Sequence, residues 1–142
     1  MTKPVAIITG GSRGVGAEVS KLLASKGWNI AITCSSSIED ANEVSKECET
    51  LGAETIVLKA DVSQPESCAQ TVEETIKKWG KLDALINNAG TTKFNAHENL
   101  DGLSKDDFLG LYATNTVGPY MMIKEARESL LKSNNPSVVN VA

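Results

Sequence analysis

The chain has 142 residues, a hydrophobic content of 41% and a formal net charge of −4 at pH 7. This length and apolar content suit one globular domain with its own core and leave no room for a second. The acidic balance gives no support to a nucleic-acid partner or to an anionic membrane surface. No apolar stretch reaches transmembrane length, and the N-terminus runs directly into a predicted strand, so we expect a cytoplasmic protein.

Apolar runs and amphipathic stretches alternate along the chain, which is typical of βαβ units. Strands are predicted at residues 5–9, 29–33, 55–59, 82–86 and 137–141. Helices are predicted at residues 14–26, 38–51, 63–79 and about 106–132, with a polar excursion at 91–105 before the last of them. This order of elements predicts an α/β fold with a parallel sheet.

Two local patterns give sharper predictions about the helices. The segment Ser63-Gln64-Pro65-Glu66 matches a capping box at the start of the third helix. In the first helix, four apolar residues share one face: Val15, Val19, Leu22 and Leu23. We expect that face to pack on the sheet.

The three cysteines, Cys34, Cys48 and Cys68, include no C-x-x-C pair. An odd set without that spacing favours reduced thiols and argues against a disulfide framework or a zinc site. We therefore expect no metal, and we expect Cys48 and Cys68 to lie on the core side of their helices.

A glycine-rich segment, Thr9-Gly10-Gly11-Ser12-Arg13-Gly14-Val15-Gly16, lies between the first strand and the first helix. Glycines allow such a tight turn, and the N–H groups at a helix N-terminus favour an anion such as phosphate. The commoner dinucleotide fingerprint would need glycine where Ser12 and Val15 stand. A phosphate-loop NTPase is excluded, because Ala17 and Glu18 occupy the positions of its lysine and hydroxyl residue. The segment therefore predicts a nucleotide-binding turn of another type.

Three further motifs follow in register. Asp61-Val62 comes after the third strand, Asn87-Asn88-Ala89-Gly90 comes after the fourth, and Asn115 lies in the last helix. Together with T-G-x-x-x-G-x-G at residues 9–16, these motifs resemble the short-chain dehydrogenase/reductase family, in particular its 3-oxoacyl-carrier-protein reductase-like members. The resemblance covers essentially the whole chain. It implies a Rossmann-type doubly wound parallel sheet with five strands in the order 3-2-1-4-5, and it implies that the C-terminal strands of the family fold are absent.

The resemblance also assigns cofactor-binding residues, so that residues 1–142 form an NADP(H)-binding Rossmann domain. The turn residues would bind the cofactor phosphates: Gly10, Gly11, Ser12, Arg13, Gly14, Val15 and Gly16. Asp61 and Val62 would hold the adenine edge. The ribose and nicotinamide side would be lined by Asn88, Ala89 and Gly90. Two alternatives remain: Asp61 caps the turn after its strand, which is compatible with binding, or residues 87–90 form an ordinary strand-ending turn.

The residues after the second strand predict which cofactor is bound. An NAD enzyme places Asp or Glu there, where the carboxylate accepts both ribose hydroxyls and repels a 2′-phosphate. This chain has Ser35, Ser36 and Ser37 instead, and Arg13 offers a guanidinium from the opposite wall. We therefore predict NADP(H) in preference to NAD(H). The alternative is a polar serine turn with Arg13 directed to solvent.

Pro119 lies inside the last predicted helix, where its missing N–H frees the carbonyl of Asn115. In the family that the chain resembles, the matching asparagine holds a water of the catalytic proton relay, so Asn115 is the predicted catalytic residue. The alternative is a proline kink without a catalytic role. Tyr120 and Lys124 match the family's Tyr-x-x-x-Lys, but they precede the fifth strand instead of following it, so we interpret them as structural.

The resemblance implies an NADP(H)-dependent oxidoreductase that transfers hydride between the nicotinamide and a small carbonyl or alcohol substrate. The family's catalytic serine and Tyr-x-x-x-Lys pair are not found at their expected place, so we predict that the chain alone is inactive. One alternative is a non-catalytic NADP(H)-binding module. Another is a subunit-assembly module, because the resemblance implies a homodimer or homotetramer through helix 106–132. Exposed apolar residues would then be needed on that helix, with Met121, Met122 and Leu130 as candidates.

Overall fold

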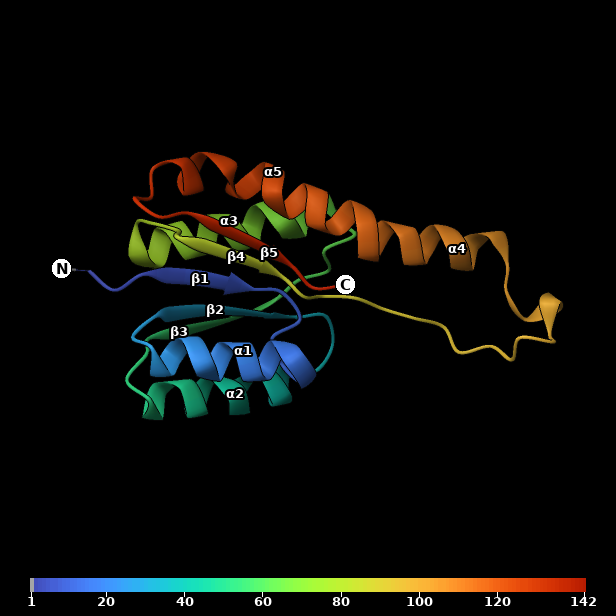
Figure 1. The fold of residues 1–142 in the computed structure, drawn as a ribbon, viewed down its shortest axis with the longest axis horizontal. Helices are drawn as coiled ribbons and strands as arrows, with labels where there is room; N and C mark the ends of the chain where they lie inside the picture. The colour runs from blue at the N-terminus through green and yellow to red at the C-terminus, as the bar shows by residue number, and fades with distance from the viewer. Residues whose placement is uncertain (1) are drawn as a thin grey trace.

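Five parallel strands form one sheet in the order β3-β2-β1-β4-β5 (Figure 1). The computed structural model describes residues 2–142. Its strands are β1 (Val5–Ile8), β2 (Asn29–Cys34), β3 (Thr55–Lys59), β4 (Ala84–Asn87) and β5 (Ser137–Asn140). The predicted Rossmann-type topology and strand order are confirmed.

Helices cover both faces of the sheet in pairs (Figure 1). One face carries α1 (Gly14–Ser25) and α2 (Ile38–Thr50), and the other carries α3 (Pro65–Trp79) and α5 (Gly118–Leu131). Two cores result. The first contains Ile8, Ile30 and Ile32, and the second contains Ile7 and Leu85. Within residues 2–142, none of the helices is both long and apolar enough to cross a membrane.

The three central strands explain where a ligand site can form. Every residue of β1, β2 and β4 is buried, because helices cover both faces of these strands, and this burial accounts for continuous apolar runs such as Val5–Ile8. Ile8 is in register with Ile32 of β2 and Ile86 of β4. The carboxyl ends of the three strands therefore meet at one edge of the sheet, and the loops that follow them lie together.

The last predicted helix is interrupted. It consists of α4 (Lys105–Tyr112), a π-turn η2 (Ala113–Val117) and α5, which follow one another without a break. In the π-turn the N–H of Gly118 donates to the carbonyl of Ala113, five residues back. Pro119 follows directly and has no N–H to continue the α-helical ladder. The prediction of one long helix was therefore correct in extent but missed the wider turn around Asn115.

The capping box predicted at Ser63 was wrong. The N–H and the hydroxyl of Ser63 both donate to Asp61 Oδ1, at 2.9 and 2.7 Å, so this serine serves a turn before the helix. The N-cap of α3 is Gln64, which makes no side-chain cap hydrogen bond. A capping box instead begins α4, where Ser104 Oγ accepts from the Asp107 N–H and Asp107 Oδ2 accepts from the Ser104 N–H.

The predicted core face of α1 was correct for Val19 and Leu23, which are partly buried and pack against the first core, and wrong for Val15 and Leu22. Val15 and Leu22 are 58% and 59% exposed. The fully buried positions of α1 are the small residues Gly16, Ala17, Ser20 and Ala24. Small side chains let the helix axis approach the strands closely, so the apolar periodicity alone did not define the buried face.

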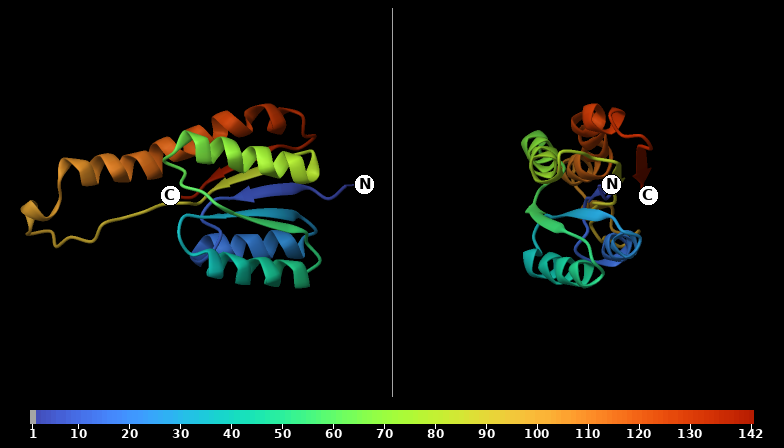
Figure 2. Two further views of the ribbon diagram at one scale, coloured as in Figure 1. Left: turned by 180° about the vertical axis from the view of Figure 1, so that it is seen from behind. Right: turned by 90° about the vertical axis from the view of Figure 1, so that its left-hand side faces the viewer.

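Residues 91–112 extend beyond the rest of the molecule, and we call this segment the arm (Figures 1 and 2). It runs out from the end of β4, makes one short 3-10 turn η1 (Leu100–Gly102), and returns through α4. No residue of α4 is buried. Phe94 and Leu100 are 95% and 87% exposed.

The three candidate apolar residues for subunit assembly on the last helix are not its exposed ones. Met122 and Leu130 are buried, and Met121 packs against the second core. Their side chains lie between α5 and the sheet, in or against the second core. The exposed large apolar residues of this helix are Phe108, Leu109, Tyr112, Tyr120 and Leu131.

Candidate nucleotide-binding site

The turn between β1 and α1 needs glycine at defined positions. Gly10 and Gly14 have φ values of +63° and +57°, a region that disfavours other residues. A Cβ on Gly10 would lie 2.9 Å from the Ala89 Cα. A Cβ on Gly16 would overlap the Gly10 carbonyl oxygen and the Asn88 side-chain nitrogen. A Cβ on Gly14, by contrast, would meet no atom within 4 Å, so the start of α1 is open to an approaching ligand.

Two loops at the carboxyl edge are joined by side-chain hydrogen bonds. Thr9 Oγ1 accepts from the N–H groups of Asn88 and Ala89, at 3.1 and 3.0 Å. In return, Asn88 Nδ2 donates to the Gly10 carbonyl oxygen at 3.0 Å. A further link runs from the Gly10 N–H to Thr33 Oγ1 at the end of β2, at 3.2 Å. These bonds hold the ends of β1, β2 and β4 in one arrangement.

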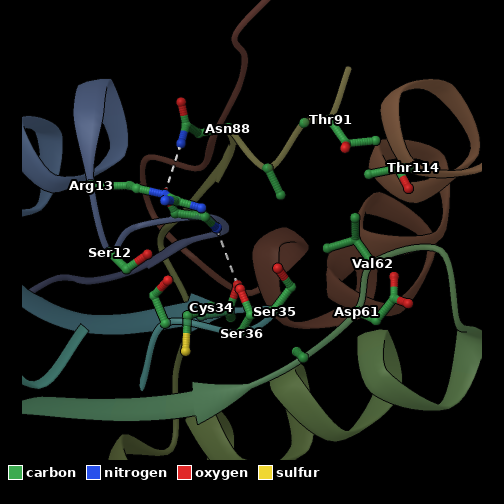
Figure 3. Close-up of a pocket in the computed structure, with 16 residues that line it drawn as sticks. Ser12, Arg13, Cys34, Ser35, Ser36, Asp61, Val62, Asn88, Thr91 and Thr114 are labelled. Carbon is green, nitrogen blue, oxygen red and sulfur yellow. Dashed lines mark hydrogen bonds between the residues drawn. The ribbon is translucent and has the colours of Figure 1, made fainter. Parts of the chain in front are cut away.

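A cleft of about 570 Å³ lies at this edge (Figure 3). Eleven predicted cofactor-binding residues line it: Gly10, Ser12, Arg13, Ser35, Ser36, Ser37, Asp61, Val62, Asn88, Ala89 and Gly90. In Figure 3, Ser12 and Arg13 lie toward one side of the cleft and Asp61 and Val62 toward the other. The residues come from the loops after β1, β2, β3 and β4, so the fold gathers four separate sequence motifs around one space.

The remaining turn residues lie around the cleft without lining it. Gly11 is buried against Ile32, and Gly16 is buried beneath Gly10. Gly14 and Val15 are exposed at the start of α1. Both buried glycines allow the close packing that shapes the turn, and neither lines the cleft.

Arg13 and the serine turn leave several polar groups free. Within residues 2–142, no hydrogen bond or ion pair engages the side chains of Arg13, Ser35, Ser36 or Ser37 in this structure. Ser37 stands at the N-cap of α2, but its hydroxyl does not cap the helix. Four side chains able to donate hydrogen bonds therefore line one end of the cleft.

Asp61 and Val62 differ in how they face the cleft. One oxygen of Asp61 accepts both hydrogen bonds from Ser63, which is the turn-capping alternative, and the residue stays exposed. Val62 is 5% exposed and is covered by Gly118 at the start of α5. A Cβ on Gly118 would lie 2.7 Å from Val62 Cγ2, so only glycine permits this approach.

Asn115 lies in the π-turn and lines a neighbouring cavity of about 910 Å³. Its side chain pairs with the backbone of Thr91, donating to the carbonyl oxygen and accepting from the N–H, both at 2.8 Å. The cavity shares Asn88, Ala89 and Gly90 with the cleft, so the two spaces adjoin. Tyr120 and Lys124 line neither space, and both are exposed.

Five lining residues were not predicted: Thr33, Cys34, Ala60, Thr91 and Thr114. Each lies one or two positions from a predicted residue, so widening every motif by two positions would have found them. Burial raises the pKa of the Cys34 thiol, which keeps it protonated. The hydroxyl of Thr9 joins two loops. The sequence included Thr9 as the first residue of the glycine motif but did not predict this role.

The other two cysteines lie in the cores, as predicted. Burial raises the pKa of both Cys48 and Cys68 to about 11. Among the described residues, no three His, Cys, Asp or Glu side chains converge on a point that could hold a metal ion.

Comparison with known proteins gives the family. A family model described as short chain dehydrogenase matches residues 4–142. The chain is 30% identical over 142 residues to 3-oxoacyl-(acyl-carrier-protein) reductase FabG of Staphylococcus aureus, an alignment that covers 100% of this chain and 56% of the reductase. The chain thus spans about half the length of the curated relatives that it matches.

Solved structures agree. A protein from Burkholderia xenovorans assigned to the short-chain dehydrogenases/reductases superposes with a TM-score of 0.95 at 34% identity, covering 100% of this chain and 60% of that one. A metagenomic short-chain oxidoreductase in complex with NADP superposes with a TM-score of 0.88 at 25% identity, covering 98% of this chain and 62% of that one. The fold is that of a doubly wound α/β protein with a cleft at the carboxyl edge of its sheet, and the chain belongs to the short-chain dehydrogenase/reductase family. Members of this family bind nicotinamide cofactors.

Proposed function

We propose that the chain binds NADP(H) in the edge cleft and serves as the cofactor-binding domain of an oxidoreductase. The reaction would transfer hydride between the nicotinamide and a carbonyl or alcohol substrate. The observation that carries the cofactor choice is the free Arg13 side chain with three unengaged serine hydroxyls in one cleft. The similarity to a 3-oxoacyl-(acyl-carrier-protein) reductase and to an NADP complex supports the reaction class.

The residues present fit a dinucleotide. Gly10 and Gly16 remove the Cβ atoms that would block the turn, and the open space at Gly14 lets a diphosphate approach the N–H groups at the start of α1. A guanidinium binds phosphate through two parallel hydrogen bonds, so Arg13 would hold the 2′-phosphate with help from the serines. A carboxylate at the end of β2 would repel that phosphate, and none lines the cleft there.

The other end of the cleft would receive the reacting part of the cofactor. Asn88, Ala89 and Gly90 lie between the cleft and the neighbouring cavity, and Asn115 lies at that cavity. When bound, the cofactor supplies or accepts the hydride. Asn115 would hold a water of a proton relay, because its carbonyl lies one turn before Pro119, which has no N–H to offer.

We expect the 142-residue chain to bind cofactor without reducing carbonyl compounds at a useful rate. Its one Tyr-x-x-x-Lys match is Tyr120 with Lys124, and Tyr120 is 65% exposed and away from both spaces. No other tyrosine and lysine in the chain have that spacing. Proton transfer to a carbonyl oxygen needs a donor within hydrogen-bond reach, and neither of these side chains provides one.

Substitution of Arg13 tests the cofactor assignment. Arg13→Ala should weaken NADPH binding by about tenfold or more, since a hydrogen bond to a charged group contributes roughly 1.5–3 kcal/mol. NADH binding should change by less than about twofold, because NADH has no 2′-phosphate. Isothermal titration of both cofactors measures the two effects.

Arg127→Ala is the matched control, since Arg127 is the other arginine of the chain and is exposed on α5. It should leave both affinities unchanged. Equal losses for NADPH and NADH in Arg13→Ala would overturn the 2′-phosphate assignment. Absence of binding for both cofactors in the unsubstituted chain would overturn the proposed function as a whole.

A second role, in subunit assembly, is favoured by the exposed apolar residues of α4. Phe108, Leu109 and Tyr112 are 64%, 57% and 60% exposed on one short helix. We propose that they pack against a second copy of the chain in a homodimer or homotetramer. Leu109→Glu should then increase the monomer fraction in sedimentation velocity, whereas Leu22→Glu, at an equally exposed site on α1, should not. Identical distributions for all three proteins would contradict assembly through α4.

A further inference from the structure

The arm is attached to the body at two points that lie next to each other. Its first residue follows Gly90 at the end of the β4 loop, and its last residue leads into the π-turn. The side chain of Asn115 makes two hydrogen bonds of 2.8 Å to the backbone of Thr91 and so joins these points. We call this pair of bonds the Asn115 clamp.

Polar contacts within the arm hold it together. Lys93 Nζ lies 2.8 Å from Asp107 Oδ2, which joins the outgoing segment to α4. At the tip, Asn95 Nδ2 donates to the carbonyl oxygens of Ala96 and Asn99. Because no residue of α4 is buried, little packing fixes the arm to the body. The arm can therefore move as a unit about its two attachment points.

The same attachment points form part of the cleft wall. Thr91 and Thr114 line the cleft, and Thr114 directly precedes Asn115 in the π-turn (Figure 3). At the other end of that turn, Gly118 packs closely on Val62, which also lines the cleft. A molecule that contacts Thr91 or Thr114 in the cleft therefore touches the segments that carry the arm, and one that contacts Val62 touches a residue packed on the end of the π-turn.

The local backbone suits a hinge. Single π-turns within α-helices occur frequently at functional sites, where the hydrogen-bond ladder is already interrupted. Gly90 lies next to Thr91, and glycine gives the backbone at this attachment point more conformational freedom than any other residue would.

We propose that occupancy of the cleft by the dinucleotide restricts the arm through the Asn115 clamp, so that cofactor binding regulates how the apolar surface of the arm is presented. This inference rests on the proposed function. A ligand acts at a distance in this way when it binds one arrangement of the hinge more tightly than the others.

Hydrogen–deuterium exchange of the 142-residue chain, with and without NADPH, tests the coupling. NADPH should slow exchange at residues 10–17 and also at residues 92–112, in the arm by on the order of fivefold, the lower end of typical coupling between sites. In Asn115→Ala, NADPH should still slow exchange at residues 10–17 but leave the arm unchanged. Asn42→Ala, at an exposed asparagine of α2, should behave like the unsubstituted chain.

The outcomes separate this coupling from the proposed function. Protection at residues 10–17 with no change in the arm of the unsubstituted chain would overturn the coupling and leave the proposed function standing. Full protection of the arm in Asn115→Ala would also overturn it. No protection at residues 10–17 at saturating NADPH would overturn the proposed function, and the coupling with it.

A second variant guards against misfolding of Asn115→Ala. Asn115→Asp can still accept from the Thr91 N–H but cannot donate to its carbonyl, so it should retain part of the protection of the arm. Arm protection in Asn115→Asp that equals the protection in the unsubstituted chain would contradict a role for the bond that Asn115 donates to Thr91. Thermal unfolding of each variant establishes that it is folded before exchange is compared.

Discussion

The body of the molecule and its arm are stabilised by different interactions. In the body, which comprises the sheet and the helices that cover it, the central strands are buried on both faces and the glycine turn is set by backbone contacts that leave no room for a Cβ. In the arm, no residue of α4 is buried, and exposed polar side chains define the shape. The body can therefore hold a ligand site rigidly, whereas the arm depends on a few bonds that solvent and ligands can alter.

Two glycine substitutions, one in the body and one in the arm, should change the unfolding free energy in opposite directions. Gly16→Ala would push a Cβ into the Gly10 carbonyl and the Asn88 side chain. We expect a loss of roughly 2–3 kcal/mol in unfolding free energy from overpacking, together with loss of NADPH binding. Gly110→Ala on α4 meets no atom within 4 Å and should stabilise the helix by about 0.5–1 kcal/mol.

Urea unfolding of both variants measures the contrast. The change in unfolding free energy should be negative for Gly16→Ala and positive for Gly110→Ala, whatever the two magnitudes. Tolerance of alanine at residue 16, with cofactor affinity unchanged, would mean that the turn is not set by the close contact.

Asp83 is the main charged group inside the body. Its carboxylate accepts from the Val5 N–H at 2.9 Å and from the Ser133 hydroxyl at 2.6 Å, and Lys81 Nζ lies 3.2 Å away. It therefore joins the start of β1, the start of β4 and the turn after α5. Burial acts to raise the pKa of Asp83, but the hydrogen bonds from Ser133, Val5 and Lys81 outweigh it and lower the pKa below 3.8.

Asp83→Asn should destabilise the whole body by about 2 kcal/mol at neutral pH, because hydrogen bonds to a charged acceptor are lost. Since the pKa is lower in the folded state, the contribution of Asp83 is complete above the unfolded value of 3.8 and is lost as the pH falls through the lower folded value. Denaturation at several pH values should therefore show a smaller acid loss in Asp83→Asn than in the unsubstituted chain. Parallel curves for the two proteins would refute this role.

Asp107 plays the corresponding part in the arm. The hydrogen bond from Lys93, followed by those from the Ser104 N–H and hydroxyl, lowers the pKa of Asp107 to about 2. Asp107→Asn should raise hydrogen exchange at residues 104–112 and leave the global unfolding midpoint unchanged, the smallest effect of the series. In the unsubstituted chain the same local order should be lost only as the pH falls from 3.8 toward about 2. A lowered global midpoint in Asp107→Asn would mean that the arm and the body unfold together.

The sheet and the glycine turn of the body were predictable because the type of residue at each position reflects its burial or its backbone conformation. A strand such as Val5–Ile8 is continuously apolar since both of its faces are covered, and the spacing of the glycines allows few turns besides the one observed. In a parallel sheet the loops after β1, β3 and β4 all lie at the carboxyl edge. The order of the elements in the sequence was therefore enough to predict that Arg13, Asp61 and Asn88 lie around one cleft.

The polar turns and the interrupted last helix were less predictable, because local hydrogen bonds compete there on nearly equal terms. Ser63 and Ser104 are both followed by an acidic residue three positions on, yet only Ser104 forms a capping box, since Asp61 already engages Ser63. The π-turn is not visible as a pattern, although Pro119 signalled an interruption. The pairing of Asn115 with Thr91 joins residues 24 positions apart and needed the fold to be known.

Titration of the unsubstituted chain with NADPH and NADH tests the central claim most directly, because the claim is that this chain carries a complete site for the phosphorylated cofactor. Isothermal calorimetry should give saturable binding of NADPH at one site per chain, at least about tenfold tighter than NADH, the factor that corresponds to about 1.4 kcal/mol. Tighter binding of NADH would contradict the assignment of Arg13 and the serine turn, and no binding of either cofactor would contradict the account of the cleft.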